Sequence, residues 1–199
     1  MIAVIDVTGN NLTSLVNSIH RLGFDCVLTH EHALIKEASH VILPGVGAAP
    51  PAMQALRDYQ LVELIQQLTQ PLLGICLGMQ LLFEHSEEGD VACLGLMKGR
   101  VQRLRQEPGY SVPHMGWNRL HWRHESPLQK GMEPIAYVYF VHSFAVEHCE
   151  YTVASCQYNA DISAIVQKNN TYGMQFHPEK SAETGLGLLN KFLTLGDVC

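Results

Sequence analysis

One cysteine has the neighbours that a catalytic nucleophile needs. Cys76 follows the apolar run 71–75, carries Gly74 and Gly78 two positions away on either side, and precedes a helical pattern. A nucleophile on a tight strand-to-helix turn requires small neighbours, because the backbone packs closely there. The unpaired N–H groups at the start of the helix favour a thiolate and a developing oxyanion. The alternative interpretation is a buried core cysteine at the end of a strand.

A histidine and a carboxylate near the other end of the chain supply a candidate base. His177 ends a segment of strand character, 171–177, and Glu179 lies two positions further on. Residues i and i+2 of an extended segment point to the same side, and Pro178 keeps the residue before it extended. We therefore expect Glu179 to orient the His177 imidazole, which completes a triad in the chain order Cys, His, Glu.

A glycine-bracketed loop follows a short buried strand and is a candidate oxyanion-binding element. The strand 40–43 leads into the loop 44–47, which reads Pro-Gly-Val-Gly. An oxyanion hole needs one donor from the residue after the nucleophile and one from a nearby loop. We therefore expect the backbone N–H groups of Leu77 and of Val46 and Gly47 to form it. An ordinary strand-to-helix turn is the alternative for the loop.

Together these segments resemble the class I (triad) glutamine amidotransferases. The resemblance rests on Gly74-Ile-Cys-Leu-Gly-Met-Gln80 and Gln175-Phe-His-Pro-Glu-Lys180, and it runs from the first strand to the last helix. Three further segments narrow it to the glutaminase subunits of histidine biosynthesis: Pro44-Gly-Val-Gly47, Pro113-His-Met-Gly-Trp-Asn118 and Tyr139-Phe-Val-His-Ser143.

The resemblance implies an activity and a set of substrate contacts. Cys76 attacks the side-chain carboxamide of L-glutamine, His177 gives a proton to the leaving ammonia, and water hydrolyses the resulting thioester. The family resemblance places the substrate's amino-acid end beside Gln80, Glu88, Ser143 and Phe144. The alternatives are a plain surface position on the helix for Gln80 and a solvated charge for Glu88. The resemblance implies no cofactor.

The ammonia needs an acceptor enzyme that this chain does not contain. Its sequence has no nucleotide-binding loop and no second substrate module. The resemblance implies a heterodimer with a (β/α)8-barrel cyclase, which uses the nitrogen to make imidazole glycerol phosphate and an aminoimidazole carboxamide ribotide (AICAR). It suggests interface positions at Asn11, Trp117, Asn118 and Lys180. The alternatives are a core aromatic residue for Trp117 and a solvated lysine for Lys180.

Composition is compatible with this function and excludes others. The 199 residues, 47% hydrophobic and 16% charged, support one compact domain with a sizeable core, and the resemblance implies that residues 1–199 form a glutaminase domain. A net charge of −6 without a basic run argues against nucleic acid, and no apolar stretch approaches the ~20 residues of a membrane span. Six cysteines without framework spacing predict reduced thiols in the cytoplasm, and the scattered histidines predict no metal site.

The alternation of apolar strands with helical segments predicts an α/β fold. We expect a single-domain, open mixed sheet that is mostly parallel, with flanking helices and antiparallel additions over 99–155. The expected strands include 2–7, 24–29 and 41–43, and the expected helices are 11–22, 48–68 with a break near Tyr59, and 182–195. The nucleophile, the base and the loop then all fall at the carboxyl ends of strands.

Two other enzymatic functions remain open on the sequence. A Cys–His–Glu hydrolase of another substrate needs neither Gln80 nor a partner face around Trp117. A glutaminase paralogue that feeds a different acceptor synthase, such as one of a surface-sugar pathway, shares all of the motifs. A purely binding function is disfavoured because Cys76, His177 and Glu179 are all intact.

Overall fold

The computed structural model describes residues 1–7 and 12–196, and its main sheet mixes parallel and antiparallel strands. The strands of this sheet in the described residues are β1 (Ile2–Ile5), β2 (Cys26–Thr29), β3 (His40–Leu43), β4 (Leu72–Ile75), β8 (His114–Trp122), β9 (Ala136–His142), β11 (Thr152–Gln157), β12 (Asp161–Lys168) and β13 (Thr171–Met174). Their spatial order is β2-β1-β3-β4-β13-β12-β11-β8-β9. The pairs from β2 to β13 are parallel, and those from β13 to β9 are antiparallel.

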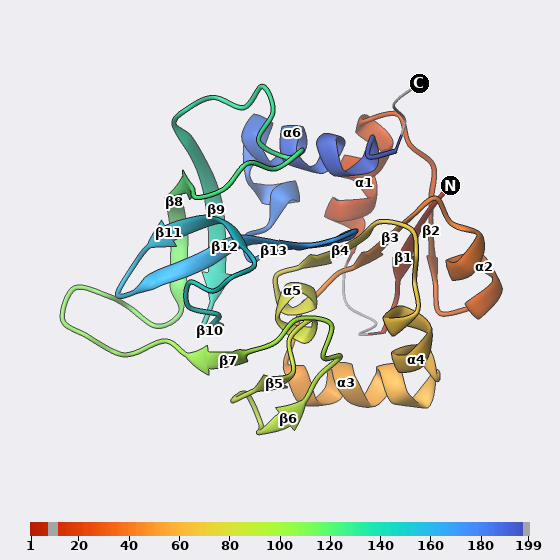
Figure 1. Ribbon diagram of the computed structural model, residues 1–199, viewed down its shortest axis with the longest axis horizontal. Coiled ribbons are helices and arrows are strands. Elements are labelled where there is room, and N and C mark those ends of the chain that lie inside the picture. Colours follow the sequence, from red (N-terminus) through yellow and green to blue (C-terminus); the bar gives the residue numbers. More distant parts are fainter. Residues whose placement is uncertain (8–11, 197–199) are drawn as a thin grey trace.

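Helices bury both faces of the parallel half of the sheet. They are α1 (Thr13–Arg21), α2 (His32–Glu37), α3 (Ala49–Asp58), α4 (Leu61–Gln66), α5 (Leu77–Leu81) and α6 (Ala182–Leu193). In β1, Ile2 and Val4 belong to the core shared with α1 and α6, whereas Ala3 and Ile5 belong to the core shared with α2 to α5. Figure 1 shows α1 and α6 on one side of the sheet and α3 to α5 on the other. Strands buried on both faces read as continuous apolar runs, as these do.

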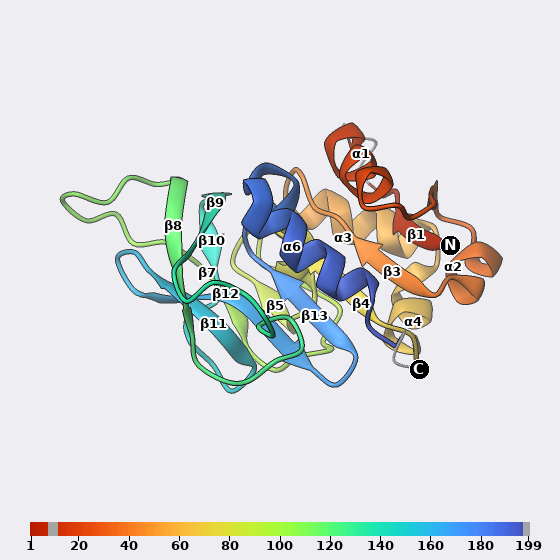
Figure 2. The ribbon, with the colours of Figure 1, turned by 90° about the horizontal axis from the view of Figure 1, so that it is seen from above.

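The antiparallel half lies at the other end of the molecule and borders a small second sheet. From above, β8, β9 and β11 gather at the end opposite to β1 and β3 (Figure 2). The second sheet consists of β5 (His85–Ser86), β6 (Val91–Ala92), β7 (Arg100–Arg103) and β10 (Phe144–Ala145). Its order is β10-β7-β5-β6, so the two-residue strand β10, which follows β9 directly, carries the chain from one sheet into the other.

The predicted α/β class and the antiparallel additions are confirmed, but the expectation of a mostly parallel sheet was wrong, because four of the eight described strand pairs of the main sheet are antiparallel. Several short elements were also missed. The long helical pattern 48–68 divides as expected, because Tyr59 ends α3 and Gln60 takes a left-handed conformation with φ 57°. The sequence did not predict α2, which has six residues and one buried side chain, or the two-residue strands β5 and β6. Elements this short carry too few residues for a periodic pattern. Within the described residues, no helix is long and apolar enough to cross a membrane.

Candidate active site

Cys76 stands on a strained turn between β4 and α5. Its backbone angles are φ 51° and ψ −110°, which residues other than glycine rarely adopt, and its N–H donates to the Met174 carbonyl at 2.7 Å. Such a conformation costs about 1–3 kcal/mol and persists only where the surrounding structure imposes it. Because β4 and β13 run parallel, the turn brings Cys76 to the same sheet edge as the residues that follow β13.

Two glycines allow the loop after β3 to lie directly against the start of α5. A Cβ atom on Gly78 would stand 1.9 Å from the Leu43 carbonyl oxygen, and one on Gly45 would stand 2.2 Å from the Gly78 nitrogen. No side chain fits either space. Gly47, at the end of the loop, has φ 111°, which also favours glycine. The loop and the nucleophile turn are therefore fitted together through their backbones.

His177 and Glu179 form a buried pair, but not through the geometry that the sequence predicted. His177 Nδ1 lies 2.8 Å from Glu179 Oε1, and the two side chains are 5% and 10% exposed. The prediction of an extended i, i+2 pair was wrong, because Pro178 begins a 3-10 turn, η1 (Pro178–Lys180). His177 itself is extended, with φ −94° and ψ 101°, and the turn folds the carboxylate back onto its ring. The Ser181 hydroxyl donates to the His177 carbonyl at 2.7 Å and fixes the turn.

The contacts of His177 favour an imidazolium. Burial lowers the pKa of His177, but hydrogen bonds to Cys76 and Glu179 and the negative charges of both groups outweigh it and raise this pKa to about 10. Since Nδ1 faces the carboxylate, Nε2 is the nitrogen left for Cys76. The arrangement places an imidazolium beside the Cys76 sulfur, and the thiolate is the reactive form of cysteine.

One cavity of about 370 Å³ joins the predicted site residues. Cys76 and His177 line it, with the loop residues 45–47 on one side and residues 141–144, from the end of β9 into β10, on the other. The expected oxyanion and substrate residues all belong to its lining: Val46, Gly47, Leu77, Gln80, Glu88, Ser143 and Phe144. The structure therefore brings the nucleophile, the base and every predicted substrate contact together.

Gln80 and Glu88 are held in defined positions. Gln80 is 4% exposed, and its side-chain amide donates to the Phe144 carbonyl at 2.8 Å. Glu88 is half-buried, and its Oε2 accepts the Ala49 N–H at 2.8 Å, which caps the start of α3. The alternatives of a plain surface residue for Gln80 and a solvated charge for Glu88 were therefore wrong.

The comparisons with known proteins agree with this geometry. Residues 3–194 match the family model described as glutamine amidotransferase class-I. The chain belongs to the class I glutamine amidotransferase family.

Two relatives show which members of the family this amidotransferase is similar to, and a solved structure shows the same fold. It is 57% identical to the imidazole glycerol phosphate synthase subunit HisH 2 of Legionella pneumophila (strain Paris) over 199 residues, which is 100% of both chains. It is 50% identical to the subunit HisH of Xylella fastidiosa (strain Temecula1) over 194 residues, which is 98% of this chain and 97% of the relative. A crystal structure of a glutamine amidotransferase matches its fold with a TM-score of 0.74 at 18% identity, covering 99% of each chain.

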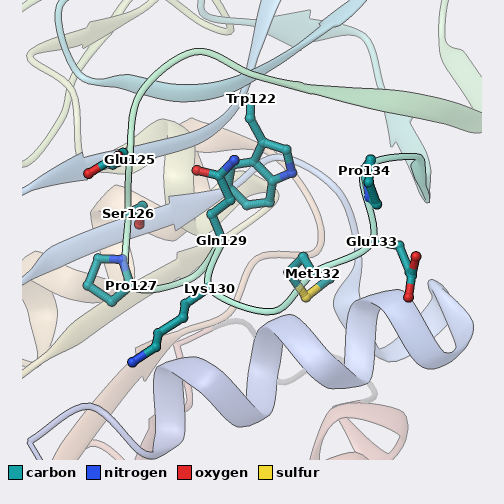
Figure 3. A pocket seen from close by; sticks show the side chains of 9 residues that line it. All are labelled: Trp122, Glu125, Ser126, Pro127, Gln129, Lys130, Met132, Glu133 and Pro134. Carbon is teal, nitrogen blue, oxygen red and sulfur yellow. The ribbon is translucent and has the colours of Figure 1, made fainter.

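The amidotransferase has a larger cavity away from this chemistry. It measures about 760 Å³ and is lined by Trp122, at the end of β8, and by residues of the loop 123–135, with Met132 next to α6 (Figure 3). No cysteine or histidine lines it. We assign the active site to the smaller cavity, because that one holds the nucleophile and its base. The described part of the chain contains no cluster of three or more His, Cys, Asp or Glu side chains that could hold a metal ion.

The described residues of the predicted interface do not share one face, because Trp117 and Asn118 are neighbours on β8 and point to opposite faces of the sheet. Trp117 is 54% exposed on β8, so the alternative of a core aromatic residue was wrong. Asn118 is half-buried and donates to the Gln157 carbonyl at 2.8 Å. Lys180 is exposed at the edge of the catalytic cavity. Asn11 lies outside the described residues.

Sequence reasoning gave no role to three buried polar side chains near the site. His114 Nδ1 lies 3.0 Å from His142 Nε2, and burial lowers the pKa of His114 to about 4 and that of His142 to about 3. Gln175 is fully buried, and its Nε2 lies 3.8 Å from Cys76 Sγ. All three stand in segments that carried the family resemblance. The only sequence signal was a polar residue at a strand position expected to be buried.

Proposed function

We propose that this chain is the glutaminase subunit of an imidazole glycerol phosphate synthase in histidine biosynthesis. It hydrolyses L-glutamine and delivers the ammonia to a cyclase, as one cytoplasmic glutaminase domain over residues 1–199. The observation that carries this proposal is Cys76 on its strained turn, in one cavity with His177 and Gln80. Identities of 48–57% to HisH subunits over nearly the whole chain support the choice of pathway.

The first half of the reaction forms a thioester. The Cys76 thiolate attacks the carboxamide carbon, so that a C–S bond forms and the carbonyl oxygen becomes an oxyanion. Backbone N–H groups of Leu77 and of the segment Val46–Gly47 stabilise this oxyanion; the loss of one such donor typically costs ~10²–10³ in rate. The C–N bond then breaks while His177 gives its proton to the leaving nitrogen, which departs as ammonia.

The second half restores the enzyme. His177, now neutral, takes a proton from water, and the resulting hydroxide attacks the γ-glutamyl thioester carbon. The C–S bond breaks, glutamate leaves, and Cys76 returns as the thiolate beside the His177 imidazolium. Glu179 keeps its charge throughout, because its role is to orient the imidazole and to stabilise the imidazolium. In sum, glutamine and water become glutamate and ammonia.

Gln80, Glu88 and the backbone of Ser143 and Phe144 bind the amino-acid end of glutamine in this proposal. Both hydrogen bonds recorded for the Gln80 side chain use its nitrogen, so its oxygen is the atom offered to a substrate N–H. Glu88 uses Oε2 to cap α3, and its carboxylate lines the cavity, where a negative charge attracts the α-ammonium group.

The partner in this proposal is a (β/α)8-barrel cyclase that docks on the face of β8 and β9. Large apolar side chains are exposed there at Met115, Trp117, Ile135 and Tyr137. A contiguous exposed apolar surface of this kind marks an interaction site. Lys180 joins this face to the catalytic cavity, so a docked partner with an opening there receives ammonia before it is protonated and lost as a nucleophile.

We expect the isolated chain to be a poor glutaminase that its liganded partner activates. The glycines of Gly45-Val46-Gly47 allow two peptide orientations, of which one aims an N–H at the oxyanion. A missing donor corresponds to ~3–4 kcal/mol of barrier, or two to three orders of magnitude in rate. A partner causes this shift only if it interacts differently with the two orientations.

The test is steady-state ammonia release by the chain alone, with the barrel cyclase, and with the cyclase plus its acceptor nucleotide. We expect low, intermediate and high rates in that order, with glutamine-dependent imidazole glycerol phosphate in the third sample. Full activity of the chain alone would eliminate the switch. Glutamine hydrolysis without any product from the cyclase would favour the alternative of a paralogue that feeds a different acceptor synthase.

A further inference from the structure

Gln175 approaches the nucleophile from inside the protein. Its side chain is fully buried just after β13, its Nε2 lies 3.8 Å from Cys76 Sγ, and its Oε1 accepts from Gln80 Nε2 at 3.1 Å. It is not part of the cavity lining, so it contacts the sulfur from within the protein interior. A contact of this kind acts on the nucleophile without touching glutamine.

The Phe144 carbonyl decides which end of the Gln175 amide faces the sulfur. A carbonyl oxygen only accepts hydrogen bonds, so the Gln80 atom 2.8 Å from it must be the NH2 nitrogen. That nitrogen also lies beside Gln175, which must then offer its oxygen. The NH2 group of Gln175 is consequently the end that points at Cys76.

The same carbonyl fixes the two buried histidines. His142 Nδ1 lies 2.8 Å from the Phe144 oxygen and must carry a proton, so its Nε2 accepts from His114 Nδ1. His114 Nε2 then accepts from the Asn118 amide at 3.4 Å. Protonation of either ring would place two donors face to face, in agreement with the lowered pKa of both histidines. Both sides of the Phe144 carbonyl are thereby occupied, and its orientation is held.

We propose that Gln175 is a further residue of the glutaminase site, whose side-chain amide donates a hydrogen bond to the Cys76 thiolate and whose orientation is imposed by the Phe144 carbonyl through Gln80. A thiolate accepts a stronger hydrogen bond than a thiol does, so this donor favours the reactive form. His142 is a positioning residue in the same network, because it holds the carbonyl that orients Gln80. The inference deepens the proposed function and rests on it.

The test measures the reactivity of Cys76 in the full chain as a function of pH. Iodoacetamide, which is uncharged, alkylates the thiolate, and mass spectrometry of the peptide reports Cys76 separately from the other cysteines. The titratable groups near the sulfur are His177 with Glu179 behind it, His142 from β9, and Glu88 and Lys180 in the cavity wall. All of them are unchanged in Gln175→Met, so a moved profile in that variant reports the lost hydrogen bonds of Gln175. Gln175→Glu adds a buried carboxyl, which is a further titratable group beside the sulfur.

Gln175→Glu keeps the shape and the acceptor for Gln80 but replaces the NH2 group, and Gln175→Met removes both hydrogen bonds. We expect the acidic limb of the alkylation profile to move up by about one pH unit, which corresponds to ~10-fold slower alkylation at a pH on that limb, where the rate is proportional to the thiolate fraction. A similar fall in kcat with little change in KM should accompany it. Gln167→Glu, on β12, is the matched control, since among the side chains of residues 1–7 and 12–196 Gln167 bonds only to Ser126 and Tyr172.

A second pair of variants tests the positioning role of His142. Asn at this position can place its side-chain NH2 where Nδ1 donates to the Phe144 carbonyl, whereas Leu cannot donate. We expect His142→Leu to shift the alkylation profile in the same direction as the Gln175 variants, and His142→Asn to restore most of the wild-type profile. Equal shifts of the alkylation profile in the two variants would show that the hydrogen bond from His142 to the Phe144 carbonyl does not position Gln80 and Gln175.

A measurement on the wild-type chain does not depend on whether any variant folds. The side-chain amide protons of Gln175, followed by NMR, should shift as Cys76 titrates and again when it is alkylated. If the chemical shifts of these protons do not change when Cys76 titrates or is alkylated, the inference is wrong. It is also wrong if a folded Gln175 variant keeps the wild-type alkylation profile. A wild-type chain that shows both NMR effects but hydrolyses no glutamine, even with the cyclase and its acceptor nucleotide, would instead overturn the proposed function.

Discussion

The parallel and the antiparallel halves of the main sheet contribute different parts of the proposed site. In the parallel half, short buried strands lead into the proposed catalytic residues: Val46, a proposed oxyanion donor, follows β3, Cys76 follows β4 and His177 follows β13. In the antiparallel half, β8 and β9 leave one face open, with Trp117 54% exposed on it. That half supplies residues 141–144 of the cavity wall and the surface that we assign to the partner.

The difference shows how one small chain can separate chemistry from docking. Reacting atoms need positions fixed by packing on every side, and only the parallel half offers strand ends in that environment. A docking surface needs exposed apolar area, which a doubly covered sheet does not have. The halves meet at the Phe144 carbonyl, which accepts from Gln80 on α5 and from His142 on β9. Substitutions in each half should therefore affect separate measurements.

The largest expected effect is the loss of the nucleophile. Cys76→Ala should reduce glutamine hydrolysis by ~10⁴-fold or more, because the side chain acts chemically and is small enough to remove without a large cavity. Docking of the partner should be retained, and high external ammonium at raised pH should still support the cyclase. Glutamine-dependent turnover in the variant complex would show that the triad is assigned to the wrong residue.

The base, His177, and its orienting group, Glu179, should differ in how much they contribute to the rate of glutamine hydrolysis. His177→Ala should lose nearly as much activity as Cys76→Ala, since members of a triad act as a unit. Glu179→Gln should lose less, because it removes only the orientation of the ring and the stabilisation of the imidazolium. The check is kcat of each purified variant in complex with the partner. Wild-type rates for either variant would instead assign the turn η1 a structural role.

A substitution in the antiparallel half should lower the affinity of the chain for the cyclase. Trp117→Ala should weaken docking of the cyclase by about 2 kcal/mol, or roughly 30-fold in Kd, as is typical of a buried aromatic anchor. Tyr59→Ala, at the junction of α3 and α4, is the matched control: this tyrosine is 42% exposed and lies outside the proposed face. Titration calorimetry with the partner gives both values. Equal affinities would place the interface elsewhere.

The smallest expected effect is a change in the pH dependence of stability. The pKa values of His114 and His142 are lowered to about 4 and 3, so between these values and 6.5 the unfolded chain binds more protons than the folded chain. Stability should therefore fall as the pH drops below 6.5, by up to about 1.4 kcal/mol per pH unit for each histidine. His142→Asn should reduce that slope by close to one proton in urea unfolding at pH 4.5–6.5. An unchanged slope would contradict the burial of a neutral His142.

The parallel half was the more predictable of the two from the sequence. Cys76 with its two glycines is a local pattern, because strain and close packing act over a few consecutive residues. The contact of His177 with Glu179 was also predicted, although the 3-10 turn that makes it was not. The α/β class followed from the alternation of strands and helices, whereas α2, β5 and β6 were too short to be recognised.

The polar network between the halves was not predictable in the same way. His114 and His142 are 28 positions apart, and Gln175 is 99 positions from Cys76. Their contacts depend on the pairing of β8 with β9 and of β13 with β4, which no local pattern specifies. A buried polar residue is recognisable in a strand pattern, but its partner is known only once the sheet order is known.

The central claim is that glutamine hydrolysis proceeds through a thioester on Cys76. The most direct test is to mix the chain, its cyclase and the acceptor nucleotide with glutamine, to quench the reaction in acid during turnover, and to map the peptides by mass spectrometry. We predict a γ-glutamyl group on the peptide that contains Cys76, which disappears when hydroxylamine is added. Ammonia release with no γ-glutamyl group on Cys76, or with the group on another cysteine, would contradict the account.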